Sequence, residues 1–374
     1  MRTRVLLGVL ALVSLVAVFT TRVSRKMPDF EVYWTAGARA AAAQPLYRES
    51  DGHYQFKYLP AFALLASPLA LLPLPAAKGA WFAVSSVLMV TLLGLSLRAL
   101  PALRKSPIVL LVVTFLAMAK FYAHELVLGQ VNLLFAVVTV LAVVWMRKGR
   151  EAGAGALLAL AVVVKPYAMI FAPWLASRRR RGALAAMVGG LAILLLLPAL
   201  RYGWDGNLRL LADWWRTVSA TTAPNLLNQD NVSLSAMYAK WIGAGSSAAL
   251  LAAVSAAVLL LLAGIVMAGR GMLQPSDTLE ASLLLILIPL LSPQGWDYVF
   301  LIATPAVMLL INDSPSLPRE LRYATFAAIV VVALSIFDLM GRDAYAAFMR
   351  LSLITVCMLV EYAALVTLRF RRAA

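Results

Sequence analysis

Hydrophobic positions dominate this 374-residue chain and form long runs, separated by short basic or polar segments. A membrane-spanning helix needs about 20 apolar residues, because each residue advances it by about 1.5 Å across a hydrocarbon core about 30 Å thick. The pattern predicts an all-α polytopic membrane protein with about 12 transmembrane helices, forming a single domain over residues 1–374. The expected spans are 5–21, 77–97, 107–123, 131–146, 152–165, 167–177, 182–200, 247–268, 280–292, 297–311, 322–340 and 346–368.

Three apolar stretches depart from a simple crossing. Residues 59–75 contain four prolines, which interrupt helical hydrogen bonding, so this stretch predicts a short helix at the outer interface. Residues 30–44 predict another short interfacial helix, ended by Pro45. Spans 152–165 and 167–177 are too short for two full crossings and meet at Lys165 and Pro166, so we expect them to form the floor of an outward-facing cavity.

Charge patterning gives the expected orientation. The chain has 33 Lys and Arg residues, 17 Asp and Glu residues and a formal net charge of +16. The cations cluster in short segments at the ends of apolar runs, including 98–105, 147–150 and 178–181, which is typical of cytoplasmic loops. This places residues 22–76 and 201–246 outside and predicts a multi-pass protein of the cell (plasma) membrane. The positive charge therefore indicates orientation in a lipid bilayer, and no nucleic-acid partner is expected.

Residue usage limits the metal chemistry. Cys357 is the single cysteine and the chain has two histidines. This excludes an intramolecular disulfide, a cysteine-based metal site and a histidine-rich metal centre. No phosphate-binding glycine-rich motif occurs, so a nucleotide-consuming site is not expected. We expect neither a metal ion nor another cofactor.

The most unusual polar segment follows the first span, where two carboxylates and three aromatic residues lie within residues 28–34. Carboxylates at a membrane edge are costly and are therefore candidates for function. Asp29 is the candidate general base, with Glu31 as the second choice. Asp29 could instead be the N-cap of the helix predicted at 30–44, since Asp is a preferred capping residue. Both alternatives remain open from the sequence.

Further polar and aromatic candidates come from several separate segments and are expected on the same outer side. Lys165 lies at a depth where a cation needs an anionic partner or a water-filled cavity. Lys165 could instead have a purely structural role, in an ion pair with Asp297. The other candidates could likewise have only structural roles, as interfacial aromatic residues, as helix caps, or as parts of loops and turns. Together they predict a substrate site that contains Glu31, Tyr33, Tyr58, Gln130, Asn132, Lys165, Asn228, Gln229, Trp296 and Asp297.

Several short motifs in one order carry a family resemblance. They are D-F-x-V-Y-W (29–34), P-L-Y (45–47), Y-x-P-x-x-A-L-L (58–65), L-G-Q-V-N (128–132), V-K-P-Y (164–167), N-Q-x-N (228–231) and S-P-x-x-W (292–296). This order resembles glycosyltransferase family 87, over roughly residues 1–311, with 312–374 as additional C-terminal helices. Two departures are that Asp297 and Tyr298 stand where the family usually carries histidine, and that Tyr58-Leu59-Pro60 replaces Tyr-Pro-Pro.

The resemblance implies a GT-C-like fold and a polyprenyl-phosphate-linked sugar donor, typically mannose. It also implies transfer to a glycolipid or glycan acceptor on the extracytoplasmic face, with inversion at the anomeric carbon and Asp29 as catalytic base. Such a donor needs an apolar groove and a cation for its phosphate, a role that suits Lys165. The alternatives are a membrane transporter or lipid flippase, which would tend to show internal repeats, and a non-catalytic partner in polymer assembly. Substitution of Asp29 distinguishes them, because transport or scaffolding should survive it.

Overall fold

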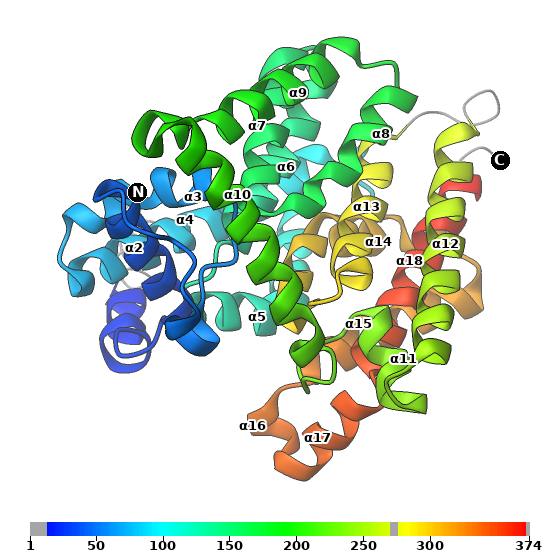
Figure 1. The fold of residues 1–374 in the computed structure, drawn as a ribbon. Helices are drawn as coiled ribbons and strands as arrows, with labels where there is room; N and C mark the ends of the chain where they lie inside the picture. The colour runs from blue at the N-terminus through cyan, green and yellow to red at the C-terminus, as the bar shows by residue number, and fades with distance from the viewer. Residues whose placement is uncertain (1–12, 270–275, 372–374) are drawn as a thin grey trace.

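The computed structural model describes residues 13–269 and 276–371, and within them the protein is built from helices (Figure 1). An antiparallel bridge between Asn231 and Trp296 is the one β pairing in these ranges. The α-helices are α2 (Pro28–Ala41), α3 (Pro60–Ala66), α4 (Leu74–Ala99), α5 (Pro107–Leu128), α6 (Asn132–Arg147), α7 (Glu151–Val164), α8 (Phe171–Ser177), α9 (Arg181–Leu196), α10 (Ala199–Thr222), α11 (Leu234–Ile242), α12 (Ser246–Ala268), α13 (Asp277–Leu291), α14 (Thr304–Asp313), α15 (Arg319–Leu334), α16 (Phe337–Met340), α17 (Arg342–Arg350) and α18 (Leu353–Arg371). Short π or 3₁₀ turns are η1 (Phe19–Val23), η2 (Glu49–Tyr54), η3 (Ser67–Leu71), η4 (Pro166–Ile170), η5 (Ala223–Asn225), η6 (Asp297–Ala303) and η7 (Ser314–Ser316).

Several helices are suited to cross a membrane. Within the described residues, five segments are long and apolar enough: Leu74–Ala99, Pro107–Leu128, Ser246–Ala268, Asp297–Ser316 and Leu353–Arg371. The α9–α10 pair, bent by 91°, would make a sixth if it formed one broken span. The prediction of an all-α, multi-pass membrane protein is confirmed, whereas twelve crossings remain a prediction because most other helices are shorter. Residues 5–12 of the first predicted span lie outside the described residues.

Some predicted boundaries are wrong, for local reasons. The predicted span 322–340 ends as a helix at Leu334, and the span predicted from 346 begins at Leu353. Between them lie the short helices α16 and α17, joined at Gly341 with a φ of 76°. That positive φ is a conformation that glycine adopts at little cost. By contrast, the proline-rich stretch 59–75 forms the expected short helix α3 followed by η3.

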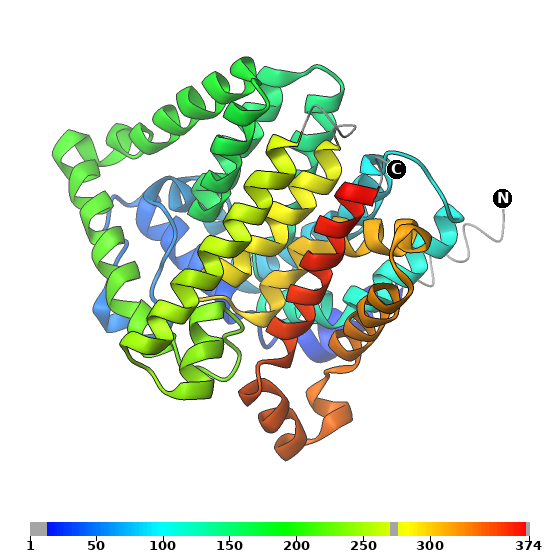
Figure 2. The same cartoon turned by 90° about the vertical axis from the view of Figure 1, so that its right-hand side faces the viewer.

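The centre of the molecule is formed by α13, η6 and α14, whose side chains are nearly all buried. Figure 2 shows α12 and α18 side by side on one face, while α10 turns sharply away from α9 at the edge. α2, α3 and α4 form the opposite flank (Figure 1). α7 and α9 approach closely at Gly155, where an added Cβ would lie 2.1 Å from the Ala183 carbonyl oxygen. Small residues allow such close helix packing in membranes.

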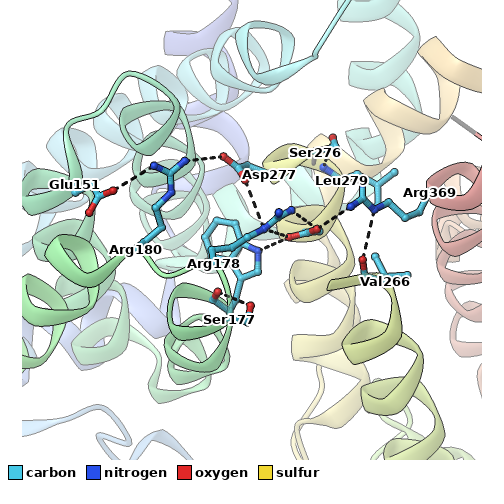
Figure 3. Close-up of polar contacts among 11 residues, drawn as sticks. Glu151, Ser177, Arg178, Arg180, Val266, Ser276, Asp277, Leu279 and Arg369 are labelled. Atoms are coloured by element: carbon cyan, nitrogen blue, oxygen red, sulfur yellow. Dashed lines mark hydrogen bonds and ion pairs between the residues drawn. The ribbon is translucent and has the colours of Figure 1, made fainter. Parts of the chain in front are cut away.

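A buried ionic cluster joins α8, α13 and α18 at the end of the molecule that carries the 178–181 basic segment (Figure 3). The Glu280 carboxylate accepts hydrogen bonds from Trp174 Nε1 at 2.8 Å and Arg178 Nε at 2.7 Å, and its Oε1 lies 3.6 Å from Arg369 Nη2. Arg180 extends the cluster, because its Nη2 lies 3.7 Å from Asp277 Oδ2 and its Nη1 lies 3.2 Å from Glu151 Oε1. Three segments distant in sequence are thereby held together by charge.

Removing the central carboxylate of this cluster should destabilise the protein strongly. We expect Glu280→Ala to lower the free energy of unfolding by about 3–5 kcal/mol, because it leaves two buried guanidinium groups without their shared partner. Glu320→Ala, at an exposed position of α15, is the matched control and should have little effect. Thermal unfolding in detergent measures both variants, and equal stability of Glu280→Ala and the wild type would contradict a structural role.

Candidate functional site

Helix α2 determines where Asp29 lies. The helix begins at Pro28, and its N-cap is Met27, which has a left-handed φ of 66° and makes no side-chain capping hydrogen bond. Asp29 is therefore the second residue of the helix, and the interpretation of Asp29 as the N-cap is wrong. Phe30 and Tyr33 are buried against neighbouring elements, whereas Asp29 stays half-buried. Its carboxylate is thus left for another role.

The N-terminus of α2 packs directly on the turn between α5 and α6. Met27 N donates to the Val127 carbonyl oxygen at 3.0 Å. Gly129, with a φ of 68°, ends α5, and an added Cβ there would lie 2.7 Å from Phe30 Cβ and 3.0 Å from Met27 Cε. Glycine therefore satisfies both the backbone conformation and the close approach. The residue that follows it, Gln130, is brought next to Asp29.

We expect Gly129→Ala to reduce activity and stability together. The substituted residue would be strained at a positive φ, and its methyl group would push the start of α2 away from the turn. A displacement of about 1 Å can cost on the order of 100-fold in rate. Gly149→Ala is a matched control, since Gly149 has a φ of 74° with nothing near its Cβ position. Equal loss of transfer in the two variants would show that strain, rather than displacement of α2, is responsible.

A hydrogen-bond network holds the groups around Asp29. The Tyr33 and Tyr58 hydroxyls lie 2.7 Å apart, and Tyr33 donates to Gln130 Oε1 at 3.0 Å. Gln130 Nε2 donates to the Tyr298 hydroxyl at 3.3 Å, and the Gln130 side chain also hydrogen-bonds the Asp29 carboxylate. Gln130 thus connects α2, the segment before α3 and η6 in one polar network.

Burial and the neighbouring groups shift the pKa of Asp29 in opposite directions. Burial raises the pKa of Asp29 above its ordinary value, while the hydrogen bond from Gln130 and the charges of Lys165, His53 and Lys57 oppose the rise. A carboxylate with a raised pKa is a better proton acceptor than an exposed one. It is still surrounded by cations that favour its charged form. This combination suits a general base.

Lys165 lies at the break between α7 and η4, as the sequence predicts, and is half-buried. Its charged neighbours are Glu125 and Asp29. Glu125 is fully buried and accepts hydrogen bonds from Asn132 Nδ2 at 2.7 Å and Leu133 N at 2.9 Å. Lys165 is therefore attracted to two carboxylates, and Asp297 pairs with Lys120 and His124 instead of Lys165.

Asp297 is fully buried and belongs to a separate ion cluster. Lys120 Nζ lies 3.2 Å from its Oδ2, and His124 Nδ1 lies 3.5 Å from its Oδ1. The His124 ring packs edge-on against Tyr298, which also contacts Gln130. A histidine therefore does lie beside this segment, but it comes from α5. Tyr298 separates the Asp297 cluster from the network around Asp29.

Not every predicted site residue joins this network. Glu31 points elsewhere and accepts from Lys78 Nζ at 2.6 Å. Asn228 Oδ1 accepts from its own loop at Asp230 N, and Gln229 is exposed. Trp296 is half-buried beside the bridge to Asn231. The structure thus brings Asp29, Tyr33, Tyr58 and Gln130 into one hydrogen-bond network, with Lys165 within electrostatic reach of Asp29. Asn132 is related to this network through Glu125, to which it donates a hydrogen bond.

The sequence reasoning left Glu125, Lys57 and Tyr298 out of the site. Glu125 is an acid within the apolar α5, and that isolation is the pattern that could have singled it out. Lys57 is not among the predicted site residues, and Tyr298 enters the sequence analysis only as one of the two residues that stand where the family usually carries histidine. Their contribution depends on contacts between distant segments, which a single sequence does not display.

A groove of about 1090 Å³ opens between the 47–57 segment and the last turns of α10. Lys57 and His53, whose charges act on Asp29, both line it. Tyr47, on the same wall, donates to the Tyr58 carbonyl oxygen at 2.7 Å. Trp214 Nε1 donates to the Lys57 carbonyl oxygen at 3.2 Å and fixes the two walls together. The groove wall is therefore joined through Tyr47 to the segment that carries Tyr58.

The fold and the site define a multi-pass membrane protein with a half-buried carboxylate in a polar network, and with an open groove whose Lys57 and His53 act electrostatically on that carboxylate. The family model described as glycosyltransferase family 87 matches residues 56–293, which is more than half of the chain. The chain belongs to glycosyltransferase family 87 and is a membrane glycosyltransferase. No curated protein and no solved structure matches it. The match begins after α2 and ends before Trp296, so the assignment of Asp29 depends on the geometry described above.

Proposed function

We propose that this protein transfers a hexosyl group, in particular mannosyl, from a polyprenyl-phosphate donor to a glycolipid or glycan acceptor on the extracytoplasmic face. The observation that carries the proposal is the half-buried Asp29 carboxylate, hydrogen-bonded to Gln130 and within electrostatic reach of Lys165. A base for the acceptor and a cation for the donor are the two groups that such a transfer needs. Family membership favours this enzyme over a transporter or flippase.

The proposed reaction is a single in-line displacement. Asp29 takes the proton of an acceptor hydroxyl while the oxygen forms a bond to the anomeric carbon. The bond from that carbon to the phosphate oxygen breaks, and polyprenyl phosphate leaves with the electron pair. Attack from the face opposite the leaving group inverts the anomeric configuration. Because Asp29 is already desolvated, proton transfer needs little rearrangement of water.

The charges of the site change in step with this reaction. Before reaction, Lys165 is attracted to both Asp29 and Glu125. When Asp29 accepts the proton it loses its negative charge, at the moment when the leaving phosphate gains one. Lys165 can then stabilise the phosphate without moving far, as a preorganised cation should. Glu125, fixed by Asn132 and Leu133, acts as a positioning residue for Lys165.

The proposed extracytoplasmic active site has a direct topological test. We expect Ser50→Cys to react with a membrane-impermeant maleimide in intact cells, and Lys148→Cys to react only after permeabilisation. Both positions are exposed, and both variants are made in a Cys357→Ala background. The expectation follows from the basic segment at 147–150. Labelling of Lys148→Cys alone in intact cells would invert the orientation.

The donor class is tested with the purified protein in lipid vesicles. Polyprenyl-phosphate-linked mannose and glucose are compared with the corresponding nucleotide sugars, using a mixture of membrane glycolipids as acceptors. We expect transfer from a lipid-phosphate sugar, with mannose favoured, and none from nucleotide sugars. Transfer from a nucleotide sugar, or equal activity after Asp29→Asn, would contradict the proposed function.

A further inference from the structure

We propose that the groove beside α10 binds several sugar units of the acceptor, so that the acceptor carries an oligosaccharide rather than a single hydroxyl on a lipid. This inference depends on the proposed function, because it assigns the acceptor side of the same site. The groove lies between the 47–57 segment and residues 213–225.

The position of the groove separates it from the side of the site assigned to the donor. Lys57 and His53 line the groove, and Lys165 lies at the break between α7 and η4, yet the charges of all three act on Asp29. Asp29 is thus within electrostatic reach of both elements. An acceptor bound in the groove would therefore lie on the Lys57 and His53 side of Asp29, apart from a phosphate bound by Lys165.

The groove lining has the chemistry of a carbohydrate site. Asp213 and Arg216 form an ion pair on its α10 wall, and Gln55 and Thr217 add amide and hydroxyl groups. These groups can donate to and accept from sugar hydroxyls. A polyprenyl chain would remove them from water without replacing their hydrogen bonds, which is costly. A separate apolar groove between α8 and α12, lined by Trp174 and Gly264, has the character that hydrocarbon requires.

Trp215 supplies the apolar face that sugar recognition needs. It lines the groove, and 64% of its surface is exposed. An indole presents a large flat surface at little conformational cost and can pack on the C–H face of a pyranose ring. Trp204, on the same helix and 61% exposed, does not line the groove. The two tryptophans are eleven positions apart, about 16 Å along the helix.

The size of the groove indicates more than one sugar. Ligand pockets that enclose a drug-sized molecule have volumes of about 300–1,000 Å³. The groove, at about 1090 Å³, reaches the upper end of this range. A single hexose would leave most of its polar lining unused. Several linked sugars would extend along the groove from Lys57 to Trp215.

The test measures sugar binding without requiring transfer. Saturation-transfer NMR titrations of the full-length protein in detergent use manno-oligosaccharides of increasing length as probes. We expect wild-type affinity to rise with chain length, and Trp215→Ala to weaken binding of the longer probes by roughly tenfold. Trp215→Phe should restore part of the affinity, and Trp204→Ala should bind as the wild type does. Correct folding of each variant is checked by its thermal unfolding.

Three results would overturn the inference: no binding of any probe by the wild type, equal affinity for monosaccharide and longer probes, or unchanged affinity in Trp215→Ala. The readout is independent of catalysis. Length-dependent binding in a protein that fails to use lipid-phosphate sugars would refute the proposed donor while supporting the groove. Normal transfer to glycolipids with no role for Trp215 would support the donor assignment and refute the groove.

Discussion

Asp29→Asn should fold normally, bind donor normally and transfer sugar about 10²–10⁴-fold more slowly than the wild type, because an amide cannot accept the proton of the acceptor. The residue is the second position of α2 rather than its N-cap, so stability should change little. The matched control is Asp205→Asn, an exposed carboxylate on α10. Donor binding and single-turnover transfer, measured on the same preparations, separate loss of chemistry from loss of affinity.

The pH dependence of transfer gives an independent signature of the same base. Burial raises the pKa of Asp29, so its charged, proton-accepting form is lost at a higher pH than for an ordinary carboxyl. Transfer should therefore fall as pH decreases through this raised pKa, and Asp29→Asn should lack that acidic limb. Full turnover by Asp29→Asn would move the base to another group. Since Glu31 pairs with Lys78, Glu125 would then be the next carboxylate to test.

Lys165→Met should lower transfer by about 10²–10³-fold, which is the usual effect of removing one preorganised charge that stabilises a developing anion. The side chain keeps much of its length and loses only the ammonium group. Because Lys165 also offsets the charges of Glu125 and Asp29, some loss of stability is expected as well. Lys148→Met, at an exposed loop position, is the control.

A double substitution distinguishes the two roles of Lys165. If Lys165 acts only as a structural partner of Glu125, Lys165→Met combined with Glu125→Gln should recover both stability and transfer. If it also stabilises the leaving phosphate, the double variant should recover stability and remain slow. Normal transfer by the single variant Lys165→Met would refute the proposal that Lys165 stabilises the leaving phosphate.

Much of the helical framework follows from the sequence, because apolar runs fix where helices form. α4, α5, α12 and α18 lie close to predicted spans. The count of crossings does not follow in the same way. α7 and α9 are short helices that pack closely through Gly155, so apolar character there reflects packing as much as contact with lipid. Hydropathy alone does not distinguish a helix that is apolar because it packs against other helices from one that is apolar because it contacts lipid.

The different roles of Asp29 and Glu31 were predictable in part. Pro28 is favoured at the first position of a helix, which already indicates that α2 starts before Asp29. Two residues apart on a helix, side chains point about 200° away from each other, since each residue turns it by about 100°. Glu31 could therefore not have shared the Asp29 site. The interpretation of Asp29 as the N-cap places Asp29 outside the helix, where this rule for side-chain directions does not apply.

The charged neighbours of Lys120 and Lys165 could not have been derived from the sequence. Lys120 and Asp297 are far apart along the chain and meet only because α5 packs against η6. Lys165 is attracted to Glu125 and Asp29, whereas Asp297 pairs with Lys120 and His124. The partners of buried charges are set by tertiary packing, so a sequence identifies that a partner is needed without identifying which one.

The central claim is a one-step displacement assisted by Asp29, and the anomeric configuration of the product tests it most directly. Purified protein is given a polyprenyl-phosphate sugar of defined anomeric configuration, and the new linkage is determined by NMR. We predict complete inversion, because a single base leaves no covalent intermediate. Retention of configuration would contradict the account, since it requires a carboxylate nucleophile and a second displacement.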